Sequence, residues 1–561
     1  MKTRETIQLH TDGFDRLPKR GAPWNVYPRP QMRRDSFICL NGRWDFAVTA
    51  GDAEPETYDR SVTVPYPVEA ELSGIGDHFP EGSGLWYRRK LPAVRFRKKQ
   101  RVLLHLDAAD RFAAVWINGK RFPEEGEFCT AVDGRATADI TDALEKSGNM
   151  IVIRCRDDLN DRSVPYGKQT LKPGGMWYTP VSGIWQTVWM EAVPEDRIRR
   201  LKITPLIDGA EIEIRGAESG EIECEGEKYL FTDGRAVIRP EDPKLWTPET
   251  PHLYDFTVRT AEDCVQSYFA IRTVGIGEVD GVPRILLNGE PYFFNGVLDQ
   301  GYWPDGLYTP ADGACYEEDI LAMKKLGFNM LRKHIKIEPE SFYYACDRLG
   351  MAVFQDMVNN GDYSFFRDTV LPTIGLQKLN DEKLHRDEKT RRAFEKAAEA
   401  EVRQLYSHPC IVYWTVFNEG WGQFDSGRMY KKIKELDPTR IVDSASGWFR
   451  GGETDVDSRH VYFKKFRMPK RSGKPVVLSE FGGYVYKVKD HSFNPGNTYG
   501  YRFYKTQEKF EEAFRRLYEE QVIPNIEKGL CAAVYTQVSD VEDETNGLLT
   551  YDRKICKIDK R

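Results

Sequence analysis

The sequence predicts a multidomain protein with an N-terminal jelly-roll β-sandwich, an immunoglobulin-like β-sandwich and a C-terminal (β/α)8 TIM barrel. Its 561 residues exceed what one hydrophobic core usually organises, so two to four domains are expected. Up to about residue 277 the chain carries short β-prone segments separated by turns. After Val282 the pattern changes to alternating strands and helices, which is typical of such a barrel.

Residues 1–195 are predicted to form the jelly-roll sandwich. Val115-Trp116-Ile117 runs into Asn118-Gly119, two residues that tolerate positive φ and therefore favour a tight hairpin. Segments 150–153 and 188–190 are also β-rich, and no convincing amphipathic helix interrupts them. Strands and turns over this length fit a jelly roll.

Residues 196–277 are predicted to form the smaller, immunoglobulin-like sandwich. Its strands are expected where apolar and polar residues alternate, at 200–204, 211–214, 235–238 and 254–258. Pro240, Pro243 and Pro248 punctuate this region.

Residues 278–561 are predicted to form the barrel. A helix from Glu317 to Leu326 is followed by Gly327, and a helix from Glu340 to Leu349 by Gly350. Glycine permits the left-handed conformation that ends a helix, and a short apolar strand follows each one. Eight strands are expected, of which the fifth and sixth have the weakest pattern: 292–297, 328–332, 351–356, 411–417, 440–444, 460–463, 475–480 and 530–536.

The composition excludes several classes of partner. A net charge of −6 leaves no basic footprint for nucleic acid or for a membrane surface. No apolar run could span a bilayer, and Met1 to His10 lacks the apolar core of a signal peptide. The 10 cysteines are scattered singly without a CxxC pair, which argues against a disulfide framework or a zinc site. We expect a cytoplasmic protein, able to form a homo-oligomer, without nucleic-acid or membrane partners.

Two of the expected barrel strands end in glutamate. Glu419 follows the fourth strand and Glu480 ends the seventh. Strand ends carry the active residues of such barrels, and an ionisable group after a buried strand is costly unless it faces a cleft. The two strands lie across the barrel from each other, so both side chains can converge. One such glutamate is more often a strand cap or an arginine partner, but two make a catalytic pair the better interpretation.

A carboxylate pair is what cleavage of a glycosidic bond requires. One carboxyl group protonates the leaving oxygen while the other meets the developing oxocarbenium ion. With the carboxyls about 5–5.5 Å apart the second group acts as a nucleophile and configuration is retained. The high aromatic content, 12%, suits sugar stacking, although it also suits sandwich cores.

Several motifs resemble those of glycoside hydrolase family 2, which contains β-galactosidases, β-glucuronidases and β-mannosidases. Phe417-Asn418-Glu419 resembles the family's acid/base motif, and Ser479-Glu480-Phe481-Gly482 its nucleophile motif. Other segments, spread over nearly the whole chain, resemble the family's signposts: 42–46, 84–88, 182–185 and 288–291. The resemblance implies a small carbohydrate or glycoside as substrate, with Glu419 as general acid/base and Glu480 as nucleophile.

The resemblance also implies substrate-binding residues. Arg332 would be the counter-ion of the nucleophile, Asn418 would bond the sugar 2-hydroxyl, and Tyr462 would hydrogen-bond the nucleophile. The remaining candidates are His334, which stands one position earlier than in the galactosidase pattern, and Asp299, Asp356, Trp448 and Asp157. Each has a structural alternative, which is a strand cap, a salt bridge, core packing or, for Asp157, a surface turn. No residue spacing indicates a metal or a cofactor.

The residues leave the sugar open. Family glucuronidases recognise the sugar carboxylate partly through an Asn-x-Lys motif after the nucleophile, and no such motif follows Glu480. Mannosidases are expected to carry Trp-Gly-rich residues where this chain has residues 333–336. A β-galactosidase-like activity is therefore the leading expectation. The positive charges of Arg332, Lys333 and Lys336 keep a uronide as the alternative, whereas the acidic segment 537–547 could be solvated or could repel anions.

Two other classes of function compete with a glycosidase. A non-catalytic carbohydrate-binding protein could keep the fold, but both glutamates are intact. An unrelated barrel enzyme would need a Schiff-base lysine or a glycine-rich phosphate loop, for which Gly482-Gly483 is too little.

Overall fold

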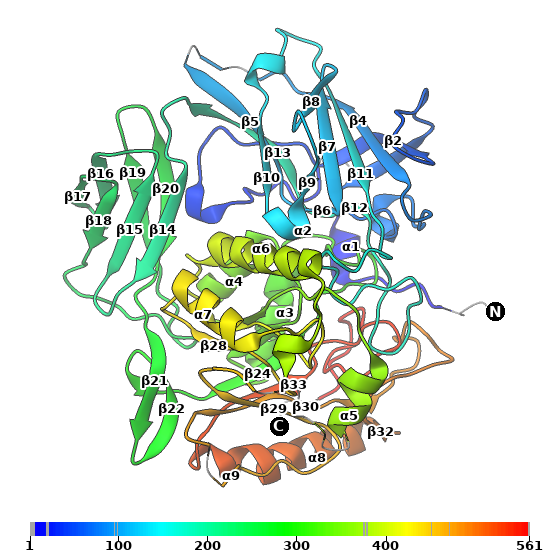
Figure 1. Cartoon of the computed structure of the whole chain (residues 1–561), viewed down its shortest axis with the longest axis vertical. Helices are drawn as coiled ribbons and strands as arrows, with labels where there is room; N and C mark the ends of the chain where they lie inside the picture. Colours follow the sequence, from blue (N-terminus) through cyan, green and yellow to red (C-terminus); the bar gives the residue numbers. More distant parts are fainter. Residues whose placement is uncertain are drawn as a thin grey trace.

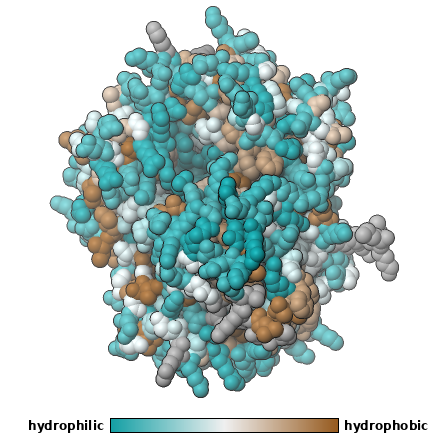
Figure 2. Space-filling view, viewed as in Figure 1, coloured by the Kyte–Doolittle hydropathy of each residue, from teal (hydrophilic) through white to brown (hydrophobic). Residues whose placement is uncertain are grey.

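The computed structural model describes residues 6–558 apart from 18–21, 95, 98, 374–375, 377–379, 450 and 471. Figure 1 shows the first sandwich at the top, the second at the left and the barrel below them. The face seen in Figure 2 is largely hydrophilic, with smaller hydrophobic patches. Among the described residues, no helix combines the length and the apolar character needed to cross a bilayer.

The first sandwich packs two antiparallel sheets around an apolar core. One sheet has the order β1-β13-β5-β10 and the other β3-β2-β4-β11-β7-β8, with β9 beside β7. The strands are β1 (Ile38–Cys39), β2 (Gly42–Thr49), β3 (Arg60–Val64), β4 (Gly84–Lys90), β5 (Gln100–Leu106), β7 (Phe112–Ile117), β8 (Lys120–Phe122), β9 (Phe128–Cys129), β10 (Ala136–Asp139), β11 (Met150–Arg156) and β13 (Val188–Pro194). Asn118 and Gly119 have φ values of 49° and 85° between β7 and β8, which confirms the hairpin.

Two short strands and two short helices also belong to this part of the chain. The strands β6 (Ala109–Asp110) and β12 (Gly183–Ile184) pair with each other, and α1 (Asp12–Arg16) and α2 (Thr130–Asp133) are short helices. Between β11 and β12 a long segment leaves the sandwich and reaches the barrel, where Tyr166 N–H donates to Asn359 O at 3.1 Å. This segment matters for the site described below.

The second sandwich shows the alternation that its sequence predicts. In β15 the side chains of Ala210, Ile212 and Ile214 are buried while the residues between them are less so. Its sheets are β14-β15-β18 and β17-β16-β19-β20, formed by β14 (Arg200–Pro205), β15 (Ala210–Arg215), β16 (Gly220–Cys224), β17 (Glu227–Phe231), β18 (Arg235–Ile238), β19 (Tyr254–Arg259) and β20 (Cys264–Phe269). A small sheet of β21 (Val274–Val279), β22 (Val282–Leu287) and β23 (Glu290–Pro291) follows.

Eight parallel strands form the barrel in the order β28-β27-β26-β25-β24-β33-β30-β29. They are β24 (Phe294–Asp299), β25 (Met330–Lys333), β26 (Ala352–Asp356), β27 (Ile411–Thr415), β28 (Ile441–Asp443), β29 (Asp457–Val461), β30 (Val476–Gly482) and β33 (Leu530–Thr536). The main helices are α3 (Ala314–Lys325), α4 (Glu340–Leu349), α6 (Glu388–Leu405), α7 (Ser426–Leu436) and α8 (Gln507–Leu517). Shorter elements are α5 (Leu371–Thr373), α9 (Ile523–Ile526), β31 (Tyr484–Tyr486) and β32 (Arg502–Tyr504). The predicted fold class is confirmed.

The sixth barrel strand begins earlier than its sequence pattern predicts. The structure has β29 at Asp457–Val461 rather than at 460–463. Ser458 and His460 are buried in it while their neighbours are only half-buried. Because these inward-facing residues are polar, they produce no apolar run and the strand is hard to recognise.

Candidate active site

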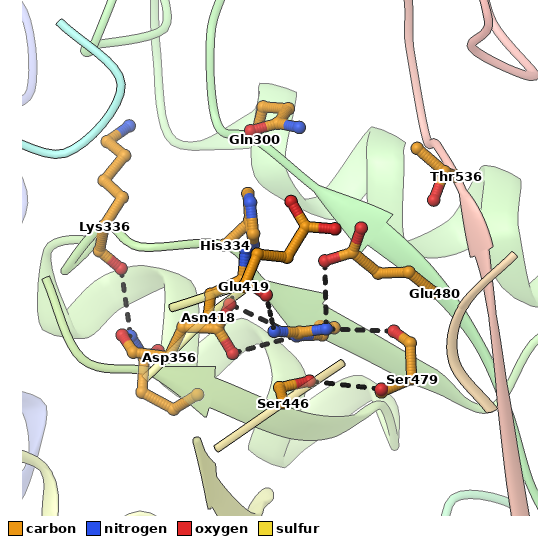
Figure 3. A network of polar contacts seen from close by, with 12 residues as sticks. Gln300, His334, Lys336, Asp356, Asn418, Glu419, Ser446, Ser479, Glu480 and Thr536 are labelled. Atoms are coloured by element: carbon orange, nitrogen blue, oxygen red, sulfur yellow. Dashed lines mark hydrogen bonds and ion pairs between the residues drawn. The ribbon is translucent and has the colours of Figure 1, made fainter. Parts of the chain in front are cut away.

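Glu419 and Glu480 meet at the mouth of the barrel. Glu480 lies within β30, and Glu419 follows β27 by four residues. One carboxylate oxygen of each glutamate and one ring nitrogen of His460 all lie within 4.8 Å of one another. The two carboxyl groups point toward each other (Figure 3). The structure therefore brings together the two glutamates found at the predicted strand ends.

A tight turn after β27 directs the Glu419 side chain across the mouth. Glu419 has φ 52° and Gly420 has φ 78°, both in the left-handed region. This conformation is costly for a residue with a side chain and needs support from its surroundings. The N–H of Glu419 donates to Ser446 O at 3.0 Å, which provides part of that support.

The surroundings of Glu480 favour its ionised form. Burial alone would raise the pKa of Glu480, but His460 and Arg332 lower it, and the pKa lies below its ordinary value. Arg332 donates from Nη1 to Oε1 of Glu480 at 3.1 Å, and the Tyr462 hydroxyl donates to Oε2. An ionised carboxylate is the form that a nucleophile requires.

Arg332 organises the floor of the site and is fully buried at the end of β25. Besides Glu480, its guanidinium donates to Asp356 Oδ1 at 2.9 Å and to Asn418 Oδ1 at 2.9 Å. The Asn418 amide oxygen is therefore held inward. Its Nδ2 is buried without a hydrogen-bond partner among the described residues, so its N–H donors are left for a ligand. A buried donor without an acceptor is costly, which makes a bound hydroxyl its natural complement.

His334 is held by Asp356 as a neutral imidazole. Its Nδ1 lies 2.7 Å from Asp356 Oδ2. Burial lowers the pKa of His334 to about 4, and the charge of Lys168 contributes to this. Because Asp356 accepts the Nδ1 proton, Nε2 keeps a lone pair that can accept from a hydroxyl. Both oxygens of Asp356 are thus engaged, one by Arg332 and the other by His334, and its contact with a sugar stays a prediction.

His460 is a site residue that the sequence reasoning missed. Its Nδ1 lies 2.8 Å from Glu419 Oε1, and its Nε2 lies 3.0 Å from Ser446 Oγ and 3.6 Å from Glu480 Oε1. The signal was the alternation of Ser458, His460 and Tyr462, all buried and all on one face of β29 and its extension. The grouping of Glu419, His460 and Glu480 also resembles a metal site. A metal would have to displace the hydrogen bonds that both ring nitrogens already make, so the contacts fit a proton-sharing group better.

Tyr462 and Trp448 lie beside the carboxylate pair. The Tyr462 ring stacks on Tyr501 at 3.9 Å between centroids, which fixes its hydroxyl next to Glu480. The Trp448 ring lies 5.4 Å from the His460 ring, and its Nε1 has no hydrogen-bond partner among the described residues. Both positions agree with a place at the substrate pocket.

Asp299 is not brought to the pair. Its Oδ2 accepts from Lys333 Nζ at 2.6 Å and its Oδ1 from Gly301 N–H at 2.9 Å. Lys333 and Lys336 each lie 2.9 Å from Glu338 Oε1. Asp299 therefore belongs to a buried ion-pair network, and its sugar contact stays a prediction. The positive charges of Lys333 and Lys336, expected near the mouth, are neutralised within the same network.

Asp157 is engaged within the first sandwich, and its predicted contact with the substrate stays a prediction. It is buried rather than in a surface turn, and its carboxylate lies 2.9 Å from Arg111 Nε in the first sandwich. Burial and the neighbouring Asp110 raise the pKa of Asp157 well above its ordinary range. The described contacts of Asp157 do not reach the carboxylate pair.

The acidic segment 537–547 is buried rather than solvated. Its carboxylates are occupied by donors from other parts of the chain, because Glu544 accepts from the Tyr178 hydroxyl and Glu542 from Thr179 N–H at 2.7 Å. Asp540 forms an ion pair with Lys557. The segment therefore ties the first sandwich to the barrel, and the carboxylates of Glu542 and Glu544 are bound by protein donors rather than solvated.

Comparison with known proteins places this fold and site in one family. Residues 279–553 match the family described as glycosyl hydrolases family 2, TIM barrel domain, and residues 197–272 match a second description, glycosyl hydrolases family 2. Together the matches span more than half of the chain. The chain belongs to glycoside hydrolase family 2.

Its relatives include proteins named β-glucuronidase. A putative β-glucuronidase of Formosa agariphila is 23% identical over 84% of this chain, which spans 60% of that relative's length. The β-glucuronidase of Chlorocebus aethiops is 24% identical, over 82% of this chain and 80% of its own. Among solved structures, the Bifidobacterium dentium β-glucuronidase complexed with coumarin-3-O-glucuronide has a TM-score of 0.70 at 18% identity, covering 93% of this chain and 96% of its own.

Proposed function

We propose that the protein is a retaining, exo-acting β-glycosidase in which Glu480 is the nucleophile and Glu419 the general acid/base. The observation that carries the proposal is the approach of the two carboxylates to within 4.8 Å. Retaining enzymes hold their carboxyl groups about 5–5.5 Å apart, whereas inverting enzymes need about 6.5–9.5 Å to admit a water molecule between them.

In the proposed mechanism each glutamate has its own step. Glu419 protonates the leaving oxygen while Glu480 attacks C1, which gives a covalent glycosyl-enzyme. Glu419 then removes a proton from the water that hydrolyses this intermediate. His460, 2.8 Å from Glu419, can stabilise the carboxylate that forms when Glu419 gives up its proton.

The remaining polar groups bind the sugar and stabilise the transition state. The free Nδ2 of Asn418 would donate to the 2-hydroxyl, a contact that strengthens as the ring flattens. The Nε2 of His334 would accept from a hydroxyl farther along the ring. A segment of the first sandwich reaches the turn that carries Glu419, where Trp177 stacks on Trp421 at 5.3 Å between centroids. A wall on this side of the barrel mouth would favour exo action.

For the sugar we propose a β-uronide, with a β-glucuronide as the first candidate. The names of the relatives support a uronide over the galactoside that the sequence motifs favoured. The acidic segment 537–547 argues less strongly against an anionic sugar, because Asp540 is paired with Lys557 and the carboxylates of Glu542 and Glu544 are bound by donors of the first sandwich. A β-galactoside is the second candidate, because a relative named β-galactosidase, from Vibrio cholerae, is 22% identical over 84% of this chain.

The proposal is tested with nitrophenyl β-glucuronide, β-galacturonide and β-galactoside. Glu480→Gln is expected to lower kcat at least about 10³-fold, because no nucleophile remains. Glu419→Ala should lose less on a nitrophenyl glycoside than on an alkyl glycoside, since nitrophenolate leaves with little protonation. Glu435→Gln, at an exposed position on α7, is the matched control. Undiminished turnover by Glu480→Gln, or a product first released with inverted configuration, would contradict the mechanism.

A further inference from the structure

Four lysines are buried in the part of the chain that the structure describes, and one of them lacks a partner. Lys333, Lys336 and Lys557 each form an ion pair with a carboxylate. Lys168, only 6% exposed, has no ion pair or hydrogen bond from its ammonium to any described residue. A largely buried lysine side chain without a counter-ion for its ammonium is unfavourable, so its retention calls for a functional explanation.

The backbone around Lys168 is fitted closely to the barrel. Gly167 has φ 65°, and a Cβ at this position would lie 3.0 Å from the Tyr308 hydroxyl and 3.1 Å from Ile335 O. The Tyr166 hydroxyl donates to Gly361 O at 2.8 Å. This long segment of the first sandwich is thus held against the barrel immediately before position 168, and the lysine reaches the barrel mouth from another domain.

The ammonium of Lys168 lies beside the substrate pocket. Its Nζ is 5.3 Å from the centroid of Trp421, which follows the acid/base glutamate by two residues, and 5.7 Å from that of Tyr178. The His334 ring lies 6.4 Å from Trp421, and the charge of Lys168 is close enough to lower the pKa of His334. The two ring faces offer the cation weak attraction only, and neither supplies an anion.

The order of groups around the pocket indicates which part of the sugar Lys168 reaches. C1 must lie at Glu419 and Glu480, and the free Nδ2 of Asn418 takes the 2-hydroxyl. Lys168 lies near Trp421, as His334 does, and its ammonium makes no hydrogen bond or ion pair with Glu419, Glu480 or Asn418 in the described part of the chain. Since those three residues hold C1 and the 2-hydroxyl, Lys168 is left for the edge of the sugar ring remote from C1.

We propose that Lys168 is a specificity residue that binds an anionic group on this remote edge of the sugar, either the carboxylate of a uronide or a sulfate ester. The inference rests on the proposed glycosidase function and deepens it. It also accounts for how an anionic sugar is recognised in a chain without an Asn-x-Lys motif after Glu480. The ligand supplies the counter-ion that the protein does not.

Lys168→Met, which keeps the length of the apolar stem, tests the proposal. We expect kcat/KM for nitrophenyl β-glucuronide or β-galacturonide to fall about 100-fold, as for a buried charge-assisted contact. The values for nitrophenyl β-galactoside and β-glucoside should change less than about 3-fold. Lys168→Arg should recover part of the uronide activity. Lys172→Met, an exposed lysine on the same segment, is the matched control and should leave both classes unchanged.

The two anionic groups are distinguished by a parallel assay with a ring-sulfated nitrophenyl galactoside. If Lys168→Met lowers kcat/KM for only one of the two substrates, the anionic group of that substrate is the one that Lys168 binds. Equal losses on anionic and neutral glycosides, or no loss on either anionic substrate, would overturn the proposal.

Lys168 can also be tested if the proposed glycosidase function is wrong. If the wild type hydrolyses no β-glycoside, calorimetric titration of glucuronate and of glucose still tests Lys168. Binding of glucuronate that Lys168→Met abolishes supports the anion site, whereas equal affinity for both sugars, or none for glucuronate, contradicts it.

Discussion

At the scale of single residues, the site depends on the hydrogen-bond donors that hold the Glu480 carboxylate. Glu480 accepts from Arg332 and from Tyr462, one on each oxygen. Arg332 has further acceptors in Asp356 and Asn418, so its removal would disturb the whole floor. Among the described residues, the Tyr462 hydroxyl is hydrogen-bonded to Glu480 and Thr536 alone, which makes it the cleaner probe of the nucleophile.

Tyr462→Phe should lower kcat/KM and shift the acidic limb of its pH profile to higher pH. The hydroxyl lowers the pKa of Glu480, so its loss raises that pKa and leaves less nucleophile ionised at low pH. The acidic limb of kcat/KM should therefore shift to higher pH. Hydrogen bonds to charged groups contribute about 1.5–3 kcal/mol, which corresponds to roughly a 10- to 100-fold loss at the optimum. The measurement is a pH–rate profile.

The control for this prediction is Tyr430→Phe. The Tyr430 hydroxyl donates to Asp455, outside the contacts of the carboxylate pair, at 2.7 Å. Its removal should leave the profile unchanged. An acidic limb that stays in place in Tyr462→Phe would show that the tyrosine does not tune Glu480.

Residues at strand ends were predictable, whereas pairings between distant segments were not. Glu419, Glu480 and Arg332 each follow or end an apolar strand, and that local pattern marks them in the sequence. Asp299 follows the same pattern, yet its partner Lys333 lies on the neighbouring strand and takes its charge. Whether a strand-end carboxylate is free or paired depends on side chains that are remote in sequence.

At the scale of elements, strand periodicity was visible where strands are apolar. β30 and β33 are buried along their whole length and were placed correctly. The predicted position of β29 was wrong because the inward face of this strand carries Ser458 and His460 rather than apolar residues. His460, the site residue that was not predicted, lies on this polar face. The lack of an apolar pattern therefore explains both the misplaced strand and the missed residue.

The turn after β27 is the element on which the acid/base position depends. Gly420 has φ 78°, and a Cβ there would collide with the ring of Phe449. Gly420→Ala should therefore displace Glu419 and lower kcat for alkyl glycosides at least about 10-fold, because a small misplacement of a catalytic group is enough for such a loss. Steady-state kinetics and thermal unfolding measure both effects.

Gly327→Ala is the control for Gly420→Ala. It introduces the same backbone strain without a clash such as the one between a Cβ at position 420 and the Phe449 ring. Gly327 has φ 88° after α3, but nothing lies within 4 Å of the position that a methyl group would take there. This variant should lose on the order of 1 kcal/mol of stability from the left-handed backbone with kcat unchanged. If Gly420→Ala behaves in the same way, the turn does not set the position of Glu419.

At the scale of the whole molecule, the first sandwich completes the site that the barrel begins. Lys168 and Trp177 come from that sandwich, and Tyr178 and Thr179 hold the segment after the last barrel strand. The sequence predicted both folds but not this docking, because the contacts join residues that are remote from each other along the chain. The same docking explains why the acidic residues in segment 537–547 are buried.

Buried charges also connect stability to pH, and His105 in the first sandwich offers a clear case. Its side chain is 1% exposed, stacks on Trp189 and lies 3.2 Å from Glu191. Burial lowers the pKa of His105 from 6.5 to about 4, and the nearby Arg29 and Arg135 contribute. The unfolded chain therefore binds a proton that the folded chain does not bind between pH 6.5 and pH 4.

Wild-type protein should consequently lose stability relative to His105→Gln as the pH falls through this window. Above pH 6.5 the histidine is neutral in both states and the difference is constant. Below pH 6.5 the wild type alone loses up to about 3 kcal/mol, since each pKa unit corresponds to about 1.36 kcal/mol. Urea denaturation of both proteins at pH 7.0, 5.5 and 4.5 measures the difference, and His10→Gln, at a half-exposed site, controls for the substitution. A stability difference that does not change with pH would show that His105 is protonated equally in the folded and unfolded states.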